Sequence, residues 1–183
     1  MHDPRGPVLL GLARQAIAAG LGLPVAVDSA DDWLRAPGAT FVTLTRRGEL
    51  RGCIGSLQAH RPLHEDVQAN ARAAAFRDPR FAPLQIEELE ITRVEVSLLS
   101  PAQALSFDSE AEALAQLQPG EDGLIFEAGR YRSTFLPQVW EQLPTPELFL
   151  SQLKRKAGLP ADYWSAGVRL SRYRVTKWKE ANR

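Results

Sequence analysis

Two hairpin signals constrain the fold more than any other feature of this sequence. FVTLT (41–45) and LRGCIG (50–55) are joined by RRGE with Gly48 at the turn, and GLIFEAGRYRSTFLP (123–137) has a turn at EAGR. Short runs rich in β-branched and aromatic residues around a glycine-containing turn are typical of antiparallel β-hairpins. The chain is therefore expected to contain antiparallel sheet.

Helical segments and further strands surround these hairpins. Apolar side chains recur at helical spacing, and capping or stop residues such as Ser, Thr, Pro and Gly bound the segments. The expected helices are 8–19, 62–77, 108–117 and 145–158, and the expected strands are 91–101 and a closing strand over 168–179. This order favours an α+β fold with mainly antiparallel sheet packed with helices rather than a doubly wound parallel sheet.

Composition narrows the class of protein. The 183 residues are 44% hydrophobic, a size and content that suit one domain with no independent second domain. Lys+Arg and Asp+Glu are both 22, so no charge excess points to nucleic acid or a membrane surface. The apolar N-terminal stretch is interrupted by Arg14 and Gln15 and is too short to span a membrane. One cysteine cannot form an internal disulfide, which suits a cytoplasmic location.

The single cysteine lies in an unusual setting. In LRGCIG, Cys53 stands between two glycines, Gly52 and Gly55, and two positions after Arg51. Regular strand alternation would place Arg51 and Cys53 on one face, with Leu50 and Ile54 facing the core. A nearby guanidinium favours a thiolate, and glycines within a strand mark a bulge or the close approach of a ligand or backbone. The alternative is a buried, structural cysteine whose glycines admit a packed helix.

Polar residues downstream are candidates for the same site. Asn70 falls on the apolar stripe of the 62–77 helix, where an amide needs a partner, either a structural group or a ligand. In FRDPRF (76–81), Asp78 and Arg80 form a local ion pair or leave a guanidinium free for a carboxylate or phosphate. The sequence has no zinc-ligand spacing and no glycine-rich phosphate loop, so we expect neither a metal nor a cofactor.

The blocks LRGCIG, NARAAAFRDPRF, VEVSLLSP, TFLPQVW and FLSQLKRKAGLP, in this order, resemble the AMMECR domain family. The resemblance covers about residues 8–178 and implies an α+β fold of a larger and a smaller subdomain, interleaved in sequence, with a cleft between them. It implies as catalytic candidates Cys53 and Arg51, and as substrate-binding candidates Gly52, Gly55, Asn70, Asp78, Arg80 and Thr134. It further implies a Memo-like protein and a radical SAM protein as partners.

Two functions remain open from the sequence. The first is a small-molecule enzyme, or a subunit of one, that uses Cys53 with an arginine that orients an anionic substrate. The second is a non-catalytic binding or adaptor module that recognises a protein or RNA, which would explain the missing catalytic histidine. The closing segment alternates basic and aromatic residues, as in sites that bind single-stranded nucleic acid. Basic side chains on an edge strand, which prevent it from pairing with other chains, give the same pattern. We therefore do not expect nucleic-acid binding.

Overall fold

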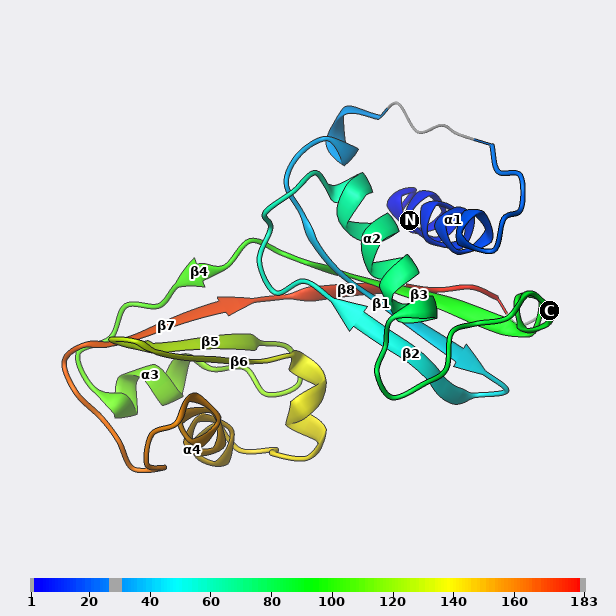
Figure 1. Cartoon of the computed structure of the whole chain (residues 1–183). Coiled ribbons are helices and arrows are strands. Elements are labelled where there is room, and N and C mark those ends of the chain that lie inside the picture. The colour runs from blue at the N-terminus through cyan, green and yellow to red at the C-terminus, as the bar shows by residue number, and fades with distance from the viewer. Residues whose placement is uncertain (1, 27–30, 182–183) are drawn as a thin grey trace. The chain divides into compact units, whose positions relative to one another are not determined.

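The computed structural model describes residues 2–26 and 31–181, and these form two units with separate apolar cores (Figure 1). The first unit takes the described residues up to Leu99 and from Thr176 onward, and the second takes Ser100–Val175. The chain leaves the first unit after Leu99 and returns to it at Thr176, so the units are interleaved in sequence.

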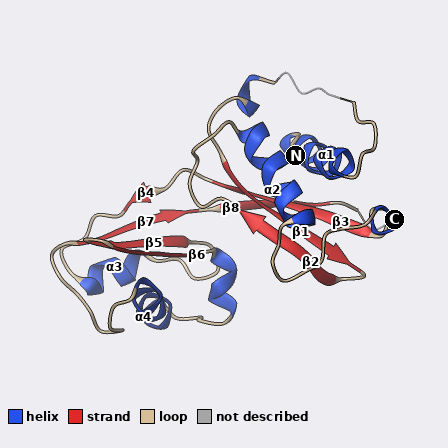
Figure 2. Cartoon of the chain, in the orientation of Figure 1, coloured by secondary structure: helices blue, strands red, loops and turns tan. Residues whose placement is uncertain are grey.

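The first unit is a four-stranded sheet with two long helices on one face (Figure 2). The strand order is β2-β1-β3-β8, and β1 pairs antiparallel with both β2 and β3. Val42, Leu44, Val94 and Val96 face the helices and are at most 1% exposed. The elements are α1 Arg5–Gly20, η1 Asp32–Leu34, β1 Ala39–Arg46, β2 Glu49–Gly55, α2 Leu63–Phe76, η2 Ile86–Glu88, β3 Thr92–Leu99 and β8 Val175–Lys179.

The second unit repeats the arrangement of one antiparallel sheet and packed helices with different residues. Its strand order is β4-β7-β5-β6. Phe149 of its longest helix stacks on Trp140, with ring centroids 3.8 Å apart, and fills the core. The elements are β4 Gln103–Ala104, α3 Glu110–Gln116, β5 Gly123–Ala128, β6 Tyr131–Phe135, η3 Pro137–Glu141, α4 Pro146–Ala157 and β7 Val168–Tyr173.

These elements confirm the α+β class and most of the expected secondary structure. The helix expected at 8–19 is α1, and the helix expected at 145–158 is α4, with Thr145 accepting a capping bond and Gly158 ending it at φ 98°. Both hairpins form as expected. Among the helices of the described residues, none has the length and apolar character that a membrane span requires.

Two expectations about strands were wrong. The closing segment 168–179 is not one strand, because the chain breaks at Arg174 and β7 and β8 join different sheets. Leu50 does not face the core but is 44% exposed. The register shifts so that Leu44 pairs with Gly52 while Thr45 pairs with Leu50, leaving Arg51 as the extra residue of a β-bulge. A bulge interrupts the alternation of faces, so Leu50 and Ile54 lie on opposite sides.

Candidate functional site

Cys53 lies on the sheet face opposite the two helices. It pairs in register with Thr43, whose neighbours Val42 and Leu44 point into the helical core. Its Sγ atom is 3.3 Å from the Thr43 hydroxyl oxygen, and the residue is half-buried and belongs to neither apolar core. The alternative of a cysteine buried in an apolar core therefore does not describe this residue.

The backbone of Cys53 is held from the open edge of β2. As the first strand in the sheet order, β2 leaves its outer N–H and C=O groups without a strand partner. The Cys53 N–H donates to Asp78 Oδ2 at 3.0 Å, and Arg80 Nη2 lies 3.4 Å from the Cys53 carbonyl oxygen. Both edge groups are thus satisfied by the two polar residues of the Asp78–Arg80 turn, which fixes the strand at the thiol.

The turn is itself an ion pair with one buried and one accessible partner. Arg80 donates to Asp78 from Nε at 3.0 Å and Nη2 at 2.7 Å, and the side chains are 54% and 2% exposed, respectively. These bonds hold the pKa of Asp78 far below its usual range, and the backbone N–H groups of Cys53 and Arg80 lower that pKa further. The pKa of Arg80 is raised, chiefly by Asp78 and to a smaller extent by the Cys53 thiolate. Arg80 is therefore an accessible cation that Asp78 anchors beside the Cys53 backbone.

Arg51 is directed elsewhere by the bulge. Its side chain is 9% exposed, and its Nε donates to Glu88 Oε1 at 3.0 Å while Nη2 donates to the Ala82 carbonyl oxygen at 2.8 Å. The pairing lowers the pKa of Glu88, and the guanidinium also lies over the Phe81 ring. Arg51 thus fastens the segment after the Asp78–Arg80 turn, and the contacts found for it do not include the thiol.

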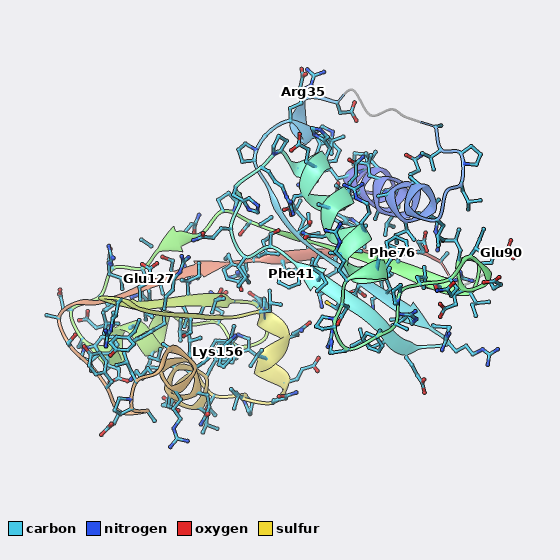
Figure 3. The ribbon with its side chains drawn as sticks, viewed as in Figure 1. Arg35, Phe41, Phe76, Glu90, Glu127 and Lys156 are labelled. Atoms are coloured by element: carbon cyan, nitrogen blue, oxygen red, sulfur yellow. The ribbon has the colours of Figure 1, made fainter. Side chains whose placement is uncertain are left out.

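The two glycines of the block are explained by packing. A Cβ atom on Gly52 would lie 2.1 Å from the Ala74 carbonyl oxygen of α2, so only glycine lets this helix lie so close to the strand. A Cβ on Gly55 would lie 2.2 Å from the ring of Phe41, a residue labelled in Figure 3. Of the readings open from the sequence, close approach of other protein atoms accounts for both positions.

Asn70 belongs to a second polar cluster around Asp66. Asp66 is fully buried and accepts hydrogen bonds from the Thr40 N–H and hydroxyl, the Ser56 hydroxyl and Arg61 Nε, at 2.7–2.8 Å. The Asn70 amide nitrogen lies 3.0 Å from the Thr40 carbonyl oxygen and 3.1 Å from both Ser56 Oγ and Asp66 Oδ2. This cluster joins α2 to β1 and the end of β2, and its hydrogen bonds do not extend to Cys53.

The remaining candidate residues lie in the second unit or the closing strands. Thr134 donates to the Tyr173 hydroxyl, 3.1 Å away, because that hydroxyl gives its own proton to the Phe135 carbonyl oxygen. Four of the five basic residues of 168–179 have ion pairs, which form between Arg169 and Glu127, Arg172 and Asp122, Arg174 and Glu121, and Lys179 and Glu95. Within the described residues no group of three or more His, Cys, Asp or Glu side chains is arranged to hold a metal ion.

Sequence reasoning missed Thr43, Asp66 and Glu88. A two-residue turn at 47–48 without a bulge would pair Cys53 with Val42, so the contact with Thr43 depends on the shift at Arg51. Asp66 and Glu88 have the polar character that is usual on helix surfaces. Tertiary packing buries Asp66 fully and Glu88 partly, and the sequence does not show this. Hairpin register plus a search for bulges would have been the one available signal for Thr43.

Comparison with known proteins places the chain in a family. The sequence profile of the AMMECR1 family matches residues 10–178. Protein MJ0810 of Methanocaldococcus jannaschii is 41% identical over 138 residues, which is 72% of this chain and 67% of that protein. A protein of Methanothermobacter thermautotrophicus is 37% identical over 187 residues, covering 96% of this chain and 94% of its own.

A solved structure shares the fold over nearly the whole chain. The crystal structure of the uncharacterised protein PH0010 from Pyrococcus horikoshii matches with a TM-score of 0.80 and 34% sequence identity, and the match covers 98% of this chain and 93% of that one. The sequence comparison and the structural comparison thus both match nearly the whole chain. The chain belongs to the AMMECR1 family.

Proposed function

We propose that this protein is an enzyme, or a subunit of one, that acts on a small anionic molecule through the thiol of Cys53. The observation that carries the proposal is a half-buried cysteine outside both apolar cores, whose backbone N–H and C=O are both held. The group at the C=O is an accessible guanidinium, that of Arg80. A structural cysteine needs neither these two backbone hydrogen bonds nor a nearby cation. Preorganised nucleophiles are held in this way.

Each residue has a separate role in the proposed site. The Thr43 hydroxyl, 3.3 Å from Sγ, donates a hydrogen bond to the sulfur once the thiol has lost its proton. Arg80 attracts both the thiolate and an oxyanion group of the substrate, because its side chain is 54% exposed although Asp78 takes two of its bonds. Asp78 fixes Cys53 and Arg80 at once, and Arg51 positions the same segment through Glu88. Gly52, Gly55 and Asn70 shape the framework on which these residues stand, whereas the hydrogen bond of Thr134 lies within the second unit.

The chemistry that fits is addition of the thiolate to an electrophilic carbon. The S–C bond forms as a leaving group departs or a carbonyl π bond opens, and the thiol proton passes to water beforehand. Sγ has one hydrogen-bond partner among the described residues, the Thr43 hydroxyl, and a hydroxyl is a poor base at neutral pH. Stabilisation of the reacting thiolate by the Arg80 cation therefore has to take the place of a general base.

The proposal includes partners and a location. The family resemblance implies a Memo-like protein and a radical SAM protein, and we propose that this chain acts with them in the cytoplasm. A single cysteine cannot supply the several thiolates that an iron–sulfur cluster requires, so radical chemistry would belong to the radical SAM partner. Co-purification of the three proteins from one cell, with a Gly52→Ala variant as the control for a disturbed first unit, tests this part.

The second candidate is a binding or adaptor module with an unreactive Cys53. The absence of an acid–base side chain hydrogen-bonded to Sγ among the described residues favours it. The two candidates differ in the electrostatic setting of the thiol, because an adaptor has no need of a cation that acts on Sγ. A chemical probe of the charge felt at Sγ therefore separates them.

The experiment compares alkylation of Cys53 by iodoacetate, an anion, and by neutral iodoacetamide. The proposed site raises the iodoacetate-to-iodoacetamide rate ratio above that of N-acetylcysteine, and Arg80→Gln lowers it on the order of threefold by removing the local cation. Arg72→Gln is the matched control, since Arg72 is exposed on α2 and that helix covers the other face of the sheet. A wild-type ratio equal to that of N-acetylcysteine and unchanged by Arg80→Gln would favour the adaptor.

A further inference from the structure

A second polar region of the first unit lies on the same sheet face as Cys53 and has no role in the proposed thiol chemistry. It is a pocket of about 540 Å³ between the end of β1, the start of β3 and the end of β8. The strand alternation that sends Val94 and Trp178 toward the helices sends Arg93 and Lys179 to this side. The lining residues are Thr45, Arg47, Gly48, Ile91, Arg93, Val94, Glu95, Lys179 and Glu180.

The carboxylates of this pocket are already neutralised. Glu95 pairs with Lys179 at 3.1 Å. Glu180 accepts two hydrogen bonds from the Arg14 guanidinium and one from the Val94 N–H. Burial raises the pKa of Glu180 most strongly, but the Arg14 and Val94 bonds and the attraction of Arg14 and Arg93 leave that pKa below its usual value. Glu180 is therefore a carboxylate whose charge is balanced by Arg14.

The cations of the pocket are less completely paired. The hydrogen bonds of the Arg93 guanidinium go to the carbonyl oxygens of Glu90 and Thr92, which leave its charge in place. Arg47 is exposed, and among the described residues its guanidinium has neither an ion pair nor a hydrogen bond. Lys179 balances the charge of Glu95, and Arg14 balances that of Glu180. The charges of Arg47 and Arg93 therefore remain as excess positive charge.

The position of Arg47 adds a further observation. Arg47 and Gly48 form a two-residue hairpin turn in which both φ angles are positive, 53° and 81°. Asn or Gly suits the first of these positions, since a side chain with a branched or long stem is strained there. Arg47 is the one non-glycine residue with positive φ in the described chain. The sequence keeps a long cation at the rim of the pocket where local stability favours asparagine.

We infer that this pocket binds the oxyanion group of a small molecule, a phosphate or a carboxylate, through Arg47, Arg93 and the Thr45 hydroxyl. Guanidinium groups form paired, charge-assisted hydrogen bonds with both anions. Ile91, which is 44% exposed at the pocket, offers an apolar surface to the carbon part of such a ligand. The site does not depend on a reactive Cys53.

The test follows backbone amide resonances by NMR during titration with two probes, inorganic phosphate and butyrate, at an ionic strength held constant with sodium chloride. We expect saturable shifts of the amides of Thr45, Gly48 and Arg93 with at least one probe. The probe that saturates identifies the ligand as a phosphorylated molecule or a carboxylic acid. Cys53→Ala should bind as the parent does, so a failure of the thiol proposal would not affect this result.

Two variants and a control connect the shifts to the cations. Arg93→Gln should weaken binding by about fivefold or more, the usual scale for loss of one charge-assisted pair. Arg47→Asn should weaken it while leaving the melting temperature unchanged or higher, because Asn-Gly is the preferred turn. Arg72→Gln should bind as the parent does. Shifts that fail to saturate with both probes, or that persist unchanged in Arg93→Gln, would overturn the inference.

Discussion

Two aspartates bind the backbone of the same hairpin, and their surroundings differ. Asp66 of α2 accepts the Thr40 N–H of β1, and Asp78 accepts the Cys53 N–H of β2. The side chain of Asp66 is fully buried and its guanidinium partner, Arg61, is 31% exposed. The partner of Asp78, Arg80, is 54% exposed and donates to the carbonyl oxygen of Cys53.

The difference separates framework from site. At Asp66, four residues direct donors at one carboxylate, and the cluster is closed by its own hydrogen bonds. At Asp78, the carboxylate secures the strand while its cation stays accessible. The same device, a buried carboxylate on a backbone N–H, therefore stabilises the hairpin at one place and orders a candidate reactive group at the other.

The largest effect should come from Asp66→Ala. The substitution leaves buried donors of Thr40, Ser56 and Asn70 without an acceptor and Arg61 without its carboxylate, so we expect a loss of about 3–5 kcal/mol in the free energy of unfolding. Urea denaturation measures it, with Asp32→Ala as the control because the Asp32 side chain is 95% exposed. A loss below about 1 kcal/mol would show that the Asp66 cluster does not hold the hairpin.

Gly52→Ala should have the next largest effect. Its new methyl group would meet the Ala74 carbonyl oxygen at 2.1 Å, so α2 or β2 must shift, at a cost of about 2–3 kcal/mol. Gly11→Ala in α1 is the matched control: a Cβ there has no atom within 4 Å, and alanine should stabilise the helix by about 0.5–1 kcal/mol. Thermal melts of both variants measure the contrast. Equal effects would mean that Gly52 is kept for a ligand rather than for the helix.

The smallest effect on stability should come from Asp78→Asn, and it should depend on pH. Because the pKa of Asp78 is lower in the folded protein than in the unfolded chain, its contribution is present above the unfolded pKa of about 3.9 and is lost as pH falls through the lower folded value. We expect a deficit of about 1–2 kcal/mol at pH 7, moderated by the exposure of Arg80.

The deficit of Asp78→Asn should shrink once the pH falls below about 4. Urea denaturation of the wild type and the variant at pH 7 and pH 3 measures this dependence. A deficit that is the same at both pH values would contradict the role of the ionised carboxylate. Asp32→Asn, at the exposed side chain, should show no deficit at either pH.

The fold could be predicted largely because local signals and tertiary structure agree. The apolar spacing of α1 predicts the buried residues Leu9, Leu12, Ala13, Ala16 and Ile17, and all five are buried. The glycine-containing turn at Gly48 likewise predicts the first hairpin, and that hairpin forms. The prediction of one closing strand was wrong at Arg174. Residues that favour strand lie on both sides of Arg174, so the sequence shows no break there. The break accompanies the ion pairs of Arg174 with Glu121 and Asp122 of the second unit.

The candidate site was less predictable, since its geometry depends on one bulge. Nothing in LRGCIG distinguishes a regular strand from one in which Arg51 is extra, yet that residue decides whether Cys53 opposes Val42 or Thr43. The sequence did indicate Asp78 and Arg80, because a proline-fixed turn of opposite charges is a local feature. The assignment of Arg51 to the thiol relied on unbroken alternation, and tertiary contacts with Glu88 replace it.

The most direct measurement of the central claim is the rate at which iodoacetamide alkylates Cys53 in the native protein. If the thiol is available in the folded state, the rate constant should lie within about tenfold of that of N-acetylcysteine. It should also be the same in Leu9→Ala, a variant that opens a cavity in the α1 core and lowers stability by about 2–5 kcal/mol. A rate slower by about a thousandfold, and faster in Leu9→Ala in proportion to its unfolding equilibrium, would show that Cys53 reacts only on unfolding and would contradict the account.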